Sequence, residues 1–128
     1  MTKSGVAADA ATVGSVVSGL KTNKETIDGW NCLTLECGIK IAYYHGDYGS
    51  TSITNAEGAL FYANFLKNLP SGFFTLFPTV LTQCELSNGY GLYITLSSNS
   101  NKNTLTGWFF TDISCTGNPY VHIVCIGV

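Results

Sequence analysis

The chain has 128 residues, enough for one compact domain, and 11% of them are charged, against about 25% in an average soluble protein. Its formal net charge is -2, and its six basic residues are scattered lysines, which argues against the clustered positive surface that nucleic acid requires. The sequence contains neither the apolar core of a signal peptide nor a run of about 18 apolar residues. We therefore predict a protein made in the cytoplasm, without a signal peptide and without membrane insertion.

Apolar residues near the N-terminus follow the spacing of a coiled coil. Between Val6 and Ile27, seven positions are separated by alternating steps of four and three residues, with Lys24 as the polar exception. A lone helix that contains Gly and β-branched residues is marginal in water, so two or three copies wrapped together would be more stable. We predict a coiled-coil helix over residues 1–29 that ends at Gly29. A helix packed on its own domain and an unstructured linker are the alternatives.

Strands are predicted in the rest of the chain, where Ser, Thr and Asn supply most of the polar surface. Residues 32–44 predict two strands around a turn at residues 36–38, and residues 45–58 predict a loop. Residues 59–69 fit a strand or a helix, and their aromatic content favours the strand. Four apolar segments after Pro78, separated by turns of Asn, Gly, Ser and Pro, predict an antiparallel meander. The last of these segments fits a strand that lies between two neighbours or along the seam of the core.

The expected fold class is therefore mainly β, an antiparallel β-sandwich of six to seven strands preceded by a short N-terminal coiled-coil helix. We divide the chain into a helical stalk, residues 1–29, and a β-sandwich domain, residues 30–128. The stalk would bring copies of the chain together, and the sandwich would form a separate globular end.

Cysteines and histidines give no sign of a metal or cofactor site. The five cysteines are an odd number, which rules out a fully paired disulfide framework, and no CxxC motif occurs. The two histidines lie far apart in the sequence. We expect the thiols to be small buried apolar groups, with a disulfide or an adventitious metal site as the alternative. Trp30, Trp108 and His122 are expected to be packing residues.

Several short stretches together suggest a family. The chain contains GVAADAATVGSVVSGLKTN before the strands, NCLTLECGIKIAYYHG as the first strand pair, and FPTVLTQCELSNGYGLYITLSS, TLTGWFF and VHIVCIGV towards the C-terminus. In this order, the stretches resemble a coiled-coil lead-in, an opening strand pair and the ending of the C-terminal tip domain of bacteriophage tail fibres and other receptor-binding proteins. The ending is also similar to H-type lectin domains, which are β-sandwiches.

The resemblance implies a homotrimer in which three helices form a stalk and three sandwiches form a tip. It implies a non-enzymatic protein of the virion whose tip attaches to a bacterial cell-surface receptor, a glycan in preference to a protein. A stand-alone H-type-like lectin and a purely structural assembly module are the alternatives.

Candidate ligand-binding residues lie in the stretch AYYHGDYG. A sugar site needs aromatic faces that stack on C–H groups and polar groups that hydrogen-bond hydroxyls, and Tyr44, His45, Asp47 and Tyr48 supply both. The alternative is a loop that only exposes its polar groups or packs Tyr48 on the sheet. An enzyme would need a nucleophile, a base and an orienting group at a recognisable spacing, and no such motif is present. We therefore predict no catalytic activity.

Overall fold

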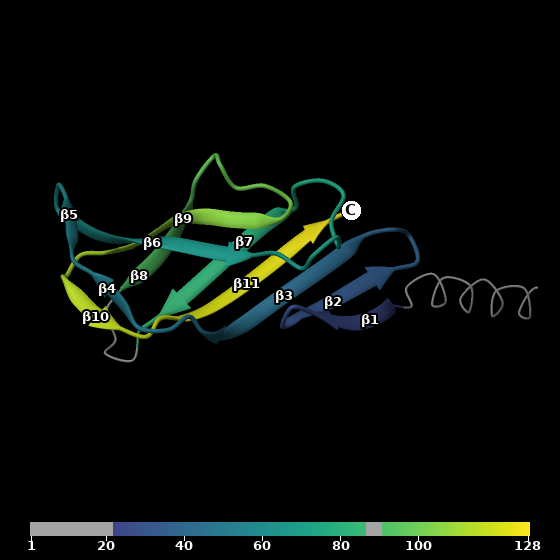
Figure 1. Cartoon of the computed structure of the whole chain (residues 1–128), viewed down its shortest axis with the longest axis horizontal. Coiled ribbons are helices and arrows are strands. Elements are labelled where there is room, and N and C mark those ends of the chain that lie inside the picture. Colours follow the sequence, from purple (N-terminus) through teal and green to yellow (C-terminus); the bar gives the residue numbers. More distant parts are fainter. Residues whose placement is uncertain (1–21, 87–90) are drawn as a thin grey trace, which may run out of the picture.

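The computed structural model describes residues 22–86 and 91–128, and this part of the chain consists of strands and their connections (Figure 1). The strands are β1 (Thr22–Ile27), β2 (Trp30–Leu35), β3 (Lys40–Asp47), β4 (Thr51–Ile53), β5 (Asn55–Glu57), β6 (Leu60–Asn68), β7 (Thr79–Glu85), β8 (Leu92–Leu96), β9 (Thr104–Thr111), β10 (Cys115–Gly117) and β11 (Tyr120–Gly127). Within the described residues, no helix is long and apolar enough to cross a membrane.

The strands form two main antiparallel sheets that lie one over the other (Figure 1). The five-stranded sheet has the order β1-β2-β3-β11-β7, and the four-stranded sheet has the order β5-β6-β9-β8. A two-stranded ribbon of β10 and β4 lies at the left-hand end in Figure 1. The predicted mainly β, antiparallel fold is confirmed for the described residues. This part of the chain has eleven strands instead of six to seven, because three short ones, β4, β5 and β10, were not expected and β1 replaces part of the predicted helix.

The core lies between the two sheets and is built from large apolar side chains. Trp30, Phe65 and Phe109 are among the largest fully buried side chains, and burying a side chain of this size contributes about 2–3 kcal/mol. Along β11, Val121, Ile123 and Cys125 point inwards and are buried, while the residues between them point outwards. The predicted packing role of Trp30 is confirmed, since it is 0% exposed and donates its indole N–H to the Asn68 carbonyl oxygen.

The N-terminal hairpin corrects the predicted helix. Residues 22–27 form β1, which pairs with β2 without interruption: Thr22 lies opposite Leu35 at one end, and Ile27 lies opposite Trp30 at the other. The helix prediction is therefore wrong for these residues. Asp28 and Gly29 both have positive φ, 52° and 83°, as a two-residue hairpin turn requires. Gly29 therefore belongs to a hairpin turn and not to the predicted helix end. The rest of the predicted stalk, residues 1–21, lies outside the described residues.

The structure also corrects the predicted loop at residues 45–58 and the predicted meander after Pro78. The loop predicted at 45–58 contains the end of β3 and all of β4 and β5, because β3 and β4 pair with the distant strands β11 and β10, while β5 pairs with the next strand, β6. The predicted meander after Pro78 is wrong, since β7 and β11 lie in the five-stranded sheet while β8 and β9 lie in the four-stranded sheet. The last strand, β11, does lie between two neighbours, β3 and β7, as predicted.

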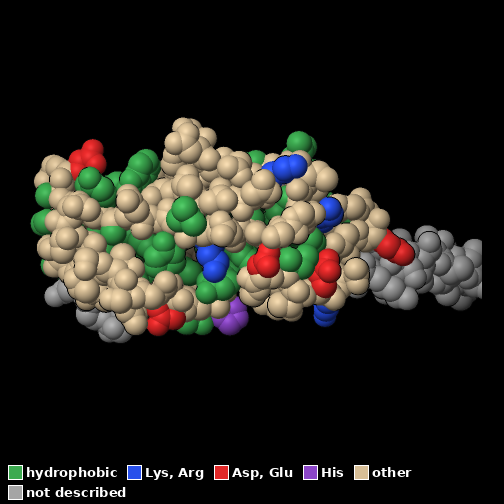
Figure 2. All heavy atoms as spheres, in the orientation of Figure 1, with side chains coloured by type: hydrophobic (Ala, Val, Ile, Leu, Met, Phe, Trp, Pro, Cys, Tyr) green, Lys and Arg blue, Asp and Glu red, His purple; other side chains and the backbone are tan. Residues whose placement is uncertain are grey.

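The outer face of the five-stranded sheet is unusually apolar. Tyr43, Leu81, Tyr120 and Ile126 point away from the core and are exposed, and Leu81 is 61% exposed. Charged side chains are few and isolated over the face of the molecule shown in Figure 2, where hydrophobic side chains reach the surface at several places. Extended apolar surface of this kind marks a site of interaction in a soluble protein.

Candidate functional site

The four predicted ligand residues do not share one surface. Tyr44, His45 and Asp47 belong to β3, not to a loop, and successive side chains of a strand point to opposite faces. His45 and Asp47 are therefore exposed on the outer face of the five-stranded sheet, while Tyr44 is half-buried on the inner side. Tyr48, just after the strand, also packs against the core.

Tyr44 and Tyr48 support the packing between the sheets. The Tyr44 ring lies 5.6 Å from the Trp30 ring, and the Tyr48 ring lies 5.5 Å from Phe65 and 4.9 Å from Phe109. The Tyr48 hydroxyl donates to the Leu66 carbonyl oxygen and accepts from the Leu66 N–H, at 3.3 and 3.0 Å. These two bonds satisfy the Leu66 N–H and carbonyl groups on the side of β6 that has no neighbouring strand at this point. Tyr48 therefore stabilises an edge of the four-stranded sheet.

His45 belongs instead to a group of four rings, Tyr43, His45, Tyr120 and His122, which we call the ring cluster. Its members lie on β3 and β11, where His45 and His122 are directly opposite in the register. The two imidazole rings lie 6.4 Å apart and nearly parallel, and Tyr43 stacks on His45 at 6.4 Å. The Tyr120 hydroxyl and His45 Nδ1 are hydrogen-bonded at 3.0 Å, which fixes the orientation of both rings.

Polar groups border the ring cluster at one end. Asp47 Oδ1 accepts the Gly49 N–H at 2.7 Å, and Asp47 Oδ2 accepts from the Asn118 amide at 3.4 Å. Glu85 Oε1 lies 3.6 Å from His122 Nε2. A hollow with a volume of about 400 Å³ adjoins these groups; its lining residues are Asp47, Glu85, Leu86, Asn118 and Tyr120. Aromatic faces beside carboxylate and amide groups are the features that a sugar site needs.

Sequence reasoning found two members of this surface and missed the others. Tyr120 and Glu85 are far from His45 in the chain, and only the pairing of β11 with β3 and β7 brings them together. A weak signal was present, because alternation along the last strand places Tyr120 and His122 on the same face. The sequence favours a structural role for His122 over a ligand role, and its side chain proves to be 44% exposed on this surface.

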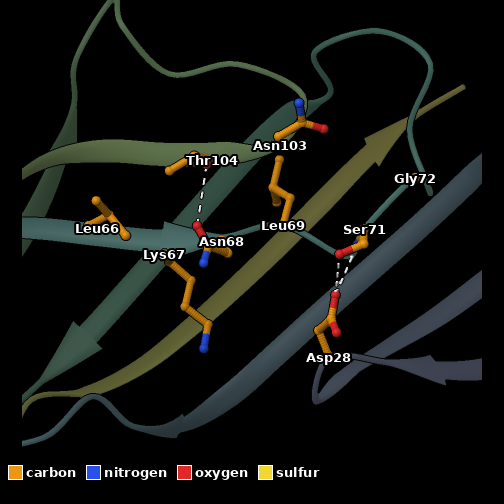
Figure 3. A pocket seen from close by; sticks show the side chains of 9 residues that line it. All are labelled: Asp28, Leu66, Lys67, Asn68, Leu69, Ser71, Gly72, Asn103 and Thr104. Carbon is orange, nitrogen blue, oxygen red and sulfur yellow. Dashed lines mark hydrogen bonds between the residues drawn. The ribbon is translucent and has the colours of Figure 1, made fainter.

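A second hollow lies over the C-terminal end of β6, and Figure 3 looks into it. We call it the β6 hollow. Its volume is about 720 Å³, within the range of small-molecule sites. The side chains around it come from the β1–β2 turn, from β6 and the segment after it, and from the start of β9: Asp28, Leu66, Lys67, Asn68, Leu69, Ser71, Gly72, Asn103 and Thr104. Most of them are polar.

The cysteines in the described part are free, and their surroundings differ. Burial raises the pKa of Cys84 to about 11 and that of Cys125 to about 12, so both thiols stay protonated at neutral pH. The expected role as small apolar groups fits Cys32 and Cys125, which are buried, but not Cys37, which is exposed. Among the described residues, no group of three or more His, Cys, Asp or Glu side chains could hold a metal ion.

Two solved structures are similar to this fold. No protein-family model matches the sequence, and no curated protein matches it. An N-truncated R1-type pyocin tail fiber is similar in structure, with a TM-score of 0.63 and 10% identity over 93% of this chain and 95% of that chain. A C-terminal part of the P. aeruginosa R1 pyocin fiber gives a TM-score of 0.63 and 9% identity, over 93% of this chain and 31% of that chain. The predicted likeness to tail-fibre tip domains is thereby confirmed at the level of the fold.

Proposed function

We propose that this chain is a non-enzymatic, tail-fibre-like protein of a phage or phage-derived particle, and that its β-sandwich attaches the particle to a bacterial cell surface. The observation that supports this proposal is the fold that it shares with R1 pyocin tail-fibre structures over 93% of its length. Low charge and exposed apolar side chains also suit a component of a larger assembly. Its location is then the virion.

The receptor in this proposal is a glycan, and the ring cluster with its polar border is the contact surface. Of the residues predicted from the sequence, His45 and Asp47 remain in the site, and Tyr120 and His122 join them. The exposed rings offer apolar faces for sugar C–H groups, and Asp47 with Asn118 offers hydrogen bonds to hydroxyls. β3 and β11 hold these groups on a rigid sheet, which limits the entropy lost on binding.

Replacing Tyr120 or Asp47 by Ala is expected to weaken binding to bacterial surface glycans about tenfold, because each change removes one stacking face or one hydrogen-bonding group. The measurement is binding of the fluorescently labelled full chain to an array of bacterial surface glycans and to intact bacterial cells. Tyr93→Ala is the matched control, since Tyr93 is an exposed tyrosine on the four-stranded sheet.

Two results would count against the glycan proposal. Binding that is equally strong in the Tyr120 and Tyr93 variants would place the receptor contact elsewhere on the molecule. No binding to any glycan or cell by an intact oligomer would favour a purely structural assembly module. Binding to glycans by a monomer would instead favour a stand-alone lectin.

We further propose that the protein is a homotrimer, held by the heptad pattern between Val6 and Leu20 and by the apolar side chains that adjoin the ring cluster on the outer face of the five-stranded sheet. On that outer face, Leu81, Val124 and Ile126 lie on neighbouring strands, β7 and β11. The first of these strands is an edge of the five-stranded sheet. Contact between copies would cover these side chains and remove them from water.

The Val13→Asp and Val17→Asp double variant is expected to be monomeric while the unchanged chain has the mass of a trimer. Both valines occupy seam positions of the heptad pattern, where a carboxylate would be buried against a second carboxylate. Light scattering coupled to size exclusion measures the mass, and far-ultraviolet circular dichroism checks that the strands are retained. A monomeric mass for the unchanged chain would refute the trimer.

A further inference from the structure

The β6 hollow contains three polar side chains, each held in place by another part of the protein while one of its polar groups stays free. Figure 3 shows Asp28, Lys67 and Asn68 around the opening, with Asp28 turned towards Ser71 and Asn68 turned towards Thr104. Polar groups that are oriented before a ligand arrives lose little entropy when they bind it. The arrangement therefore has the features of a ligand-binding site.

Asp28 presents a fixed carboxylate. Its Oδ2 atom accepts the Ser71 N–H at 3.0 Å and the Ser71 hydroxyl at 2.7 Å. These bonds lower the pKa of Asp28, so the group is ionised at neutral pH. Among the described residues, Oδ1 has no hydrogen-bond partner and is left as an acceptor.

Asn68 and Lys67 present donors. Asn68 Oδ1 accepts the Thr104 hydroxyl at 3.3 Å, which orients the side chain and leaves the amide N–H groups of Asn68 free to donate. The Lys67 ammonium lies 3.6 Å from the centre of the Tyr44 ring, and no carboxylate of the described residues lies within 4.0 Å of it. The ring thus positions a cation that has no anionic partner.

The charges of the hollow limit what it can bind. One anion, Asp28, and one cation, Lys67, cancel, and the other polar groups are hydroxyl and amide groups. A phosphate or a strongly acidic ligand would face the ionised Asp28, and an apolar ligand would leave the donors and acceptors without partners. A neutral molecule with several hydroxyl groups can satisfy both kinds of group.

We propose that the β6 hollow binds one residue of an uncharged sugar, with Asp28 accepting from its hydroxyls and Asn68 and Lys67 donating to them. This site shares no lining residue with the hollow beside the ring cluster, and it does not depend on that surface being the receptor contact. It gives the sandwich a second, separate place for a saccharide.

The test uses the full chain labelled with nitrogen-15 and a panel of mannose, galactose, glucose, N-acetylglucosamine and rhamnose. The Trp30 indole N–H donates to the Asn68 carbonyl oxygen at 2.9 Å, so its NMR signal reports on the floor of the hollow. The indole signal of Trp108, on the outer side of the four-stranded sheet, is the internal control. At least one sugar is expected to shift the Trp30 indole and Ser71 amide signals and to leave the Trp108 signal unchanged.

Asp28→Asn is the decisive variant, because Asn tolerates the positive φ of residue 28 and still accepts the Ser71 bonds. It removes the charge and, with the amide oxygen kept on Ser71, replaces the free acceptor by an N–H donor, so we expect the affinity for the sugar to fall about tenfold. Asp112→Asn, an exposed carboxylate outside the hollow, is the matched control and should bind like the unchanged chain. Absence of a shift with every sugar, or equal affinity in Asp28→Asn and the unchanged chain, would overturn the proposal. Neither result would bear on the ring cluster, whose variants are Tyr120→Ala and Asp47→Ala.

Discussion

Gly107→Ala is expected to lower the free energy of unfolding by about 3 kcal/mol, because the added methyl group has no room. A Cβ atom at residue 107 would lie 2.0 Å from the Thr95 carbonyl oxygen and 2.9 Å from the Leu96 Cα atom. Both are backbone atoms of β8, which pairs with β9 at this point. Relief would require the two strands to move apart, and their hydrogen bonds would weaken.

Gly91→Ala provides the control, since residue 91 precedes β8, has no atom within 4 Å of its added Cβ and does not have a positive φ. Its stability should change by no more than about 0.5 kcal/mol. Urea unfolding followed by tryptophan fluorescence measures both variants. Equal stability of the two would mean that β8 and β9 do not approach as closely as described.

The predictions that succeeded depended on local sequence. The turn at residues 36–38 lies between two apolar segments, and it does join β2 and β3. Residues 59–69 were predicted to be a strand from their aromatic content, and Leu60–Asn68 is β6. In both cases the side chains alone suit a pleated, half-buried surface, whichever strand lies next to it.

The predictions that failed depended on which strands pair with one another and in which sheet. An Asp-Gly pair can end a helix or turn a hairpin, and the pairing of β1 with β2 decides in favour of the hairpin. The turns after Pro78 mark where the chain reverses but not which sheet receives the next strand. The sequence therefore could not show that β7 and β8 belong to different sheets.

Unpredicted strand pairing also explains why the four candidate ligand residues do not share one surface. Reading residues 45–58 as a loop gave no direction to the side chains, so Tyr44 and Tyr48 were grouped with His45 and Asp47. Continuation of β3 to Asp47 separates them onto opposite sides of the sheet. The polar groups of the β6 hollow come from the β1–β2 turn, from β6 and from β9, and no sequence spacing would have joined them.

Phe109→Ala is expected to cost about 3–5 kcal/mol of unfolding free energy, the largest effect of any variant considered. Phe109 is 0% exposed and lies edge-on to Phe65 and Tyr48, with ring centres 5.2 and 4.9 Å apart. Its loss would leave a cavity in the middle of the core. It would also loosen Tyr48, whose hydroxyl holds the backbone of β6 at Leu66, beside the β6 hollow.

The neighbouring residue gives a matched control, because Phe110 has the same side chain on the opposite face of β9. It is half-buried and lies beside the rings of Tyr62 at 6.1 Å and Tyr93 at 5.6 Å. Phe110→Ala should therefore cost only about 1 kcal/mol. A one-residue shift in the register of β9 would exchange the two faces and reverse the order of these losses. Urea unfolding of the two variants thus tests which face of β9 meets the core, and with it the placement of Tyr48 and of the β6 hollow.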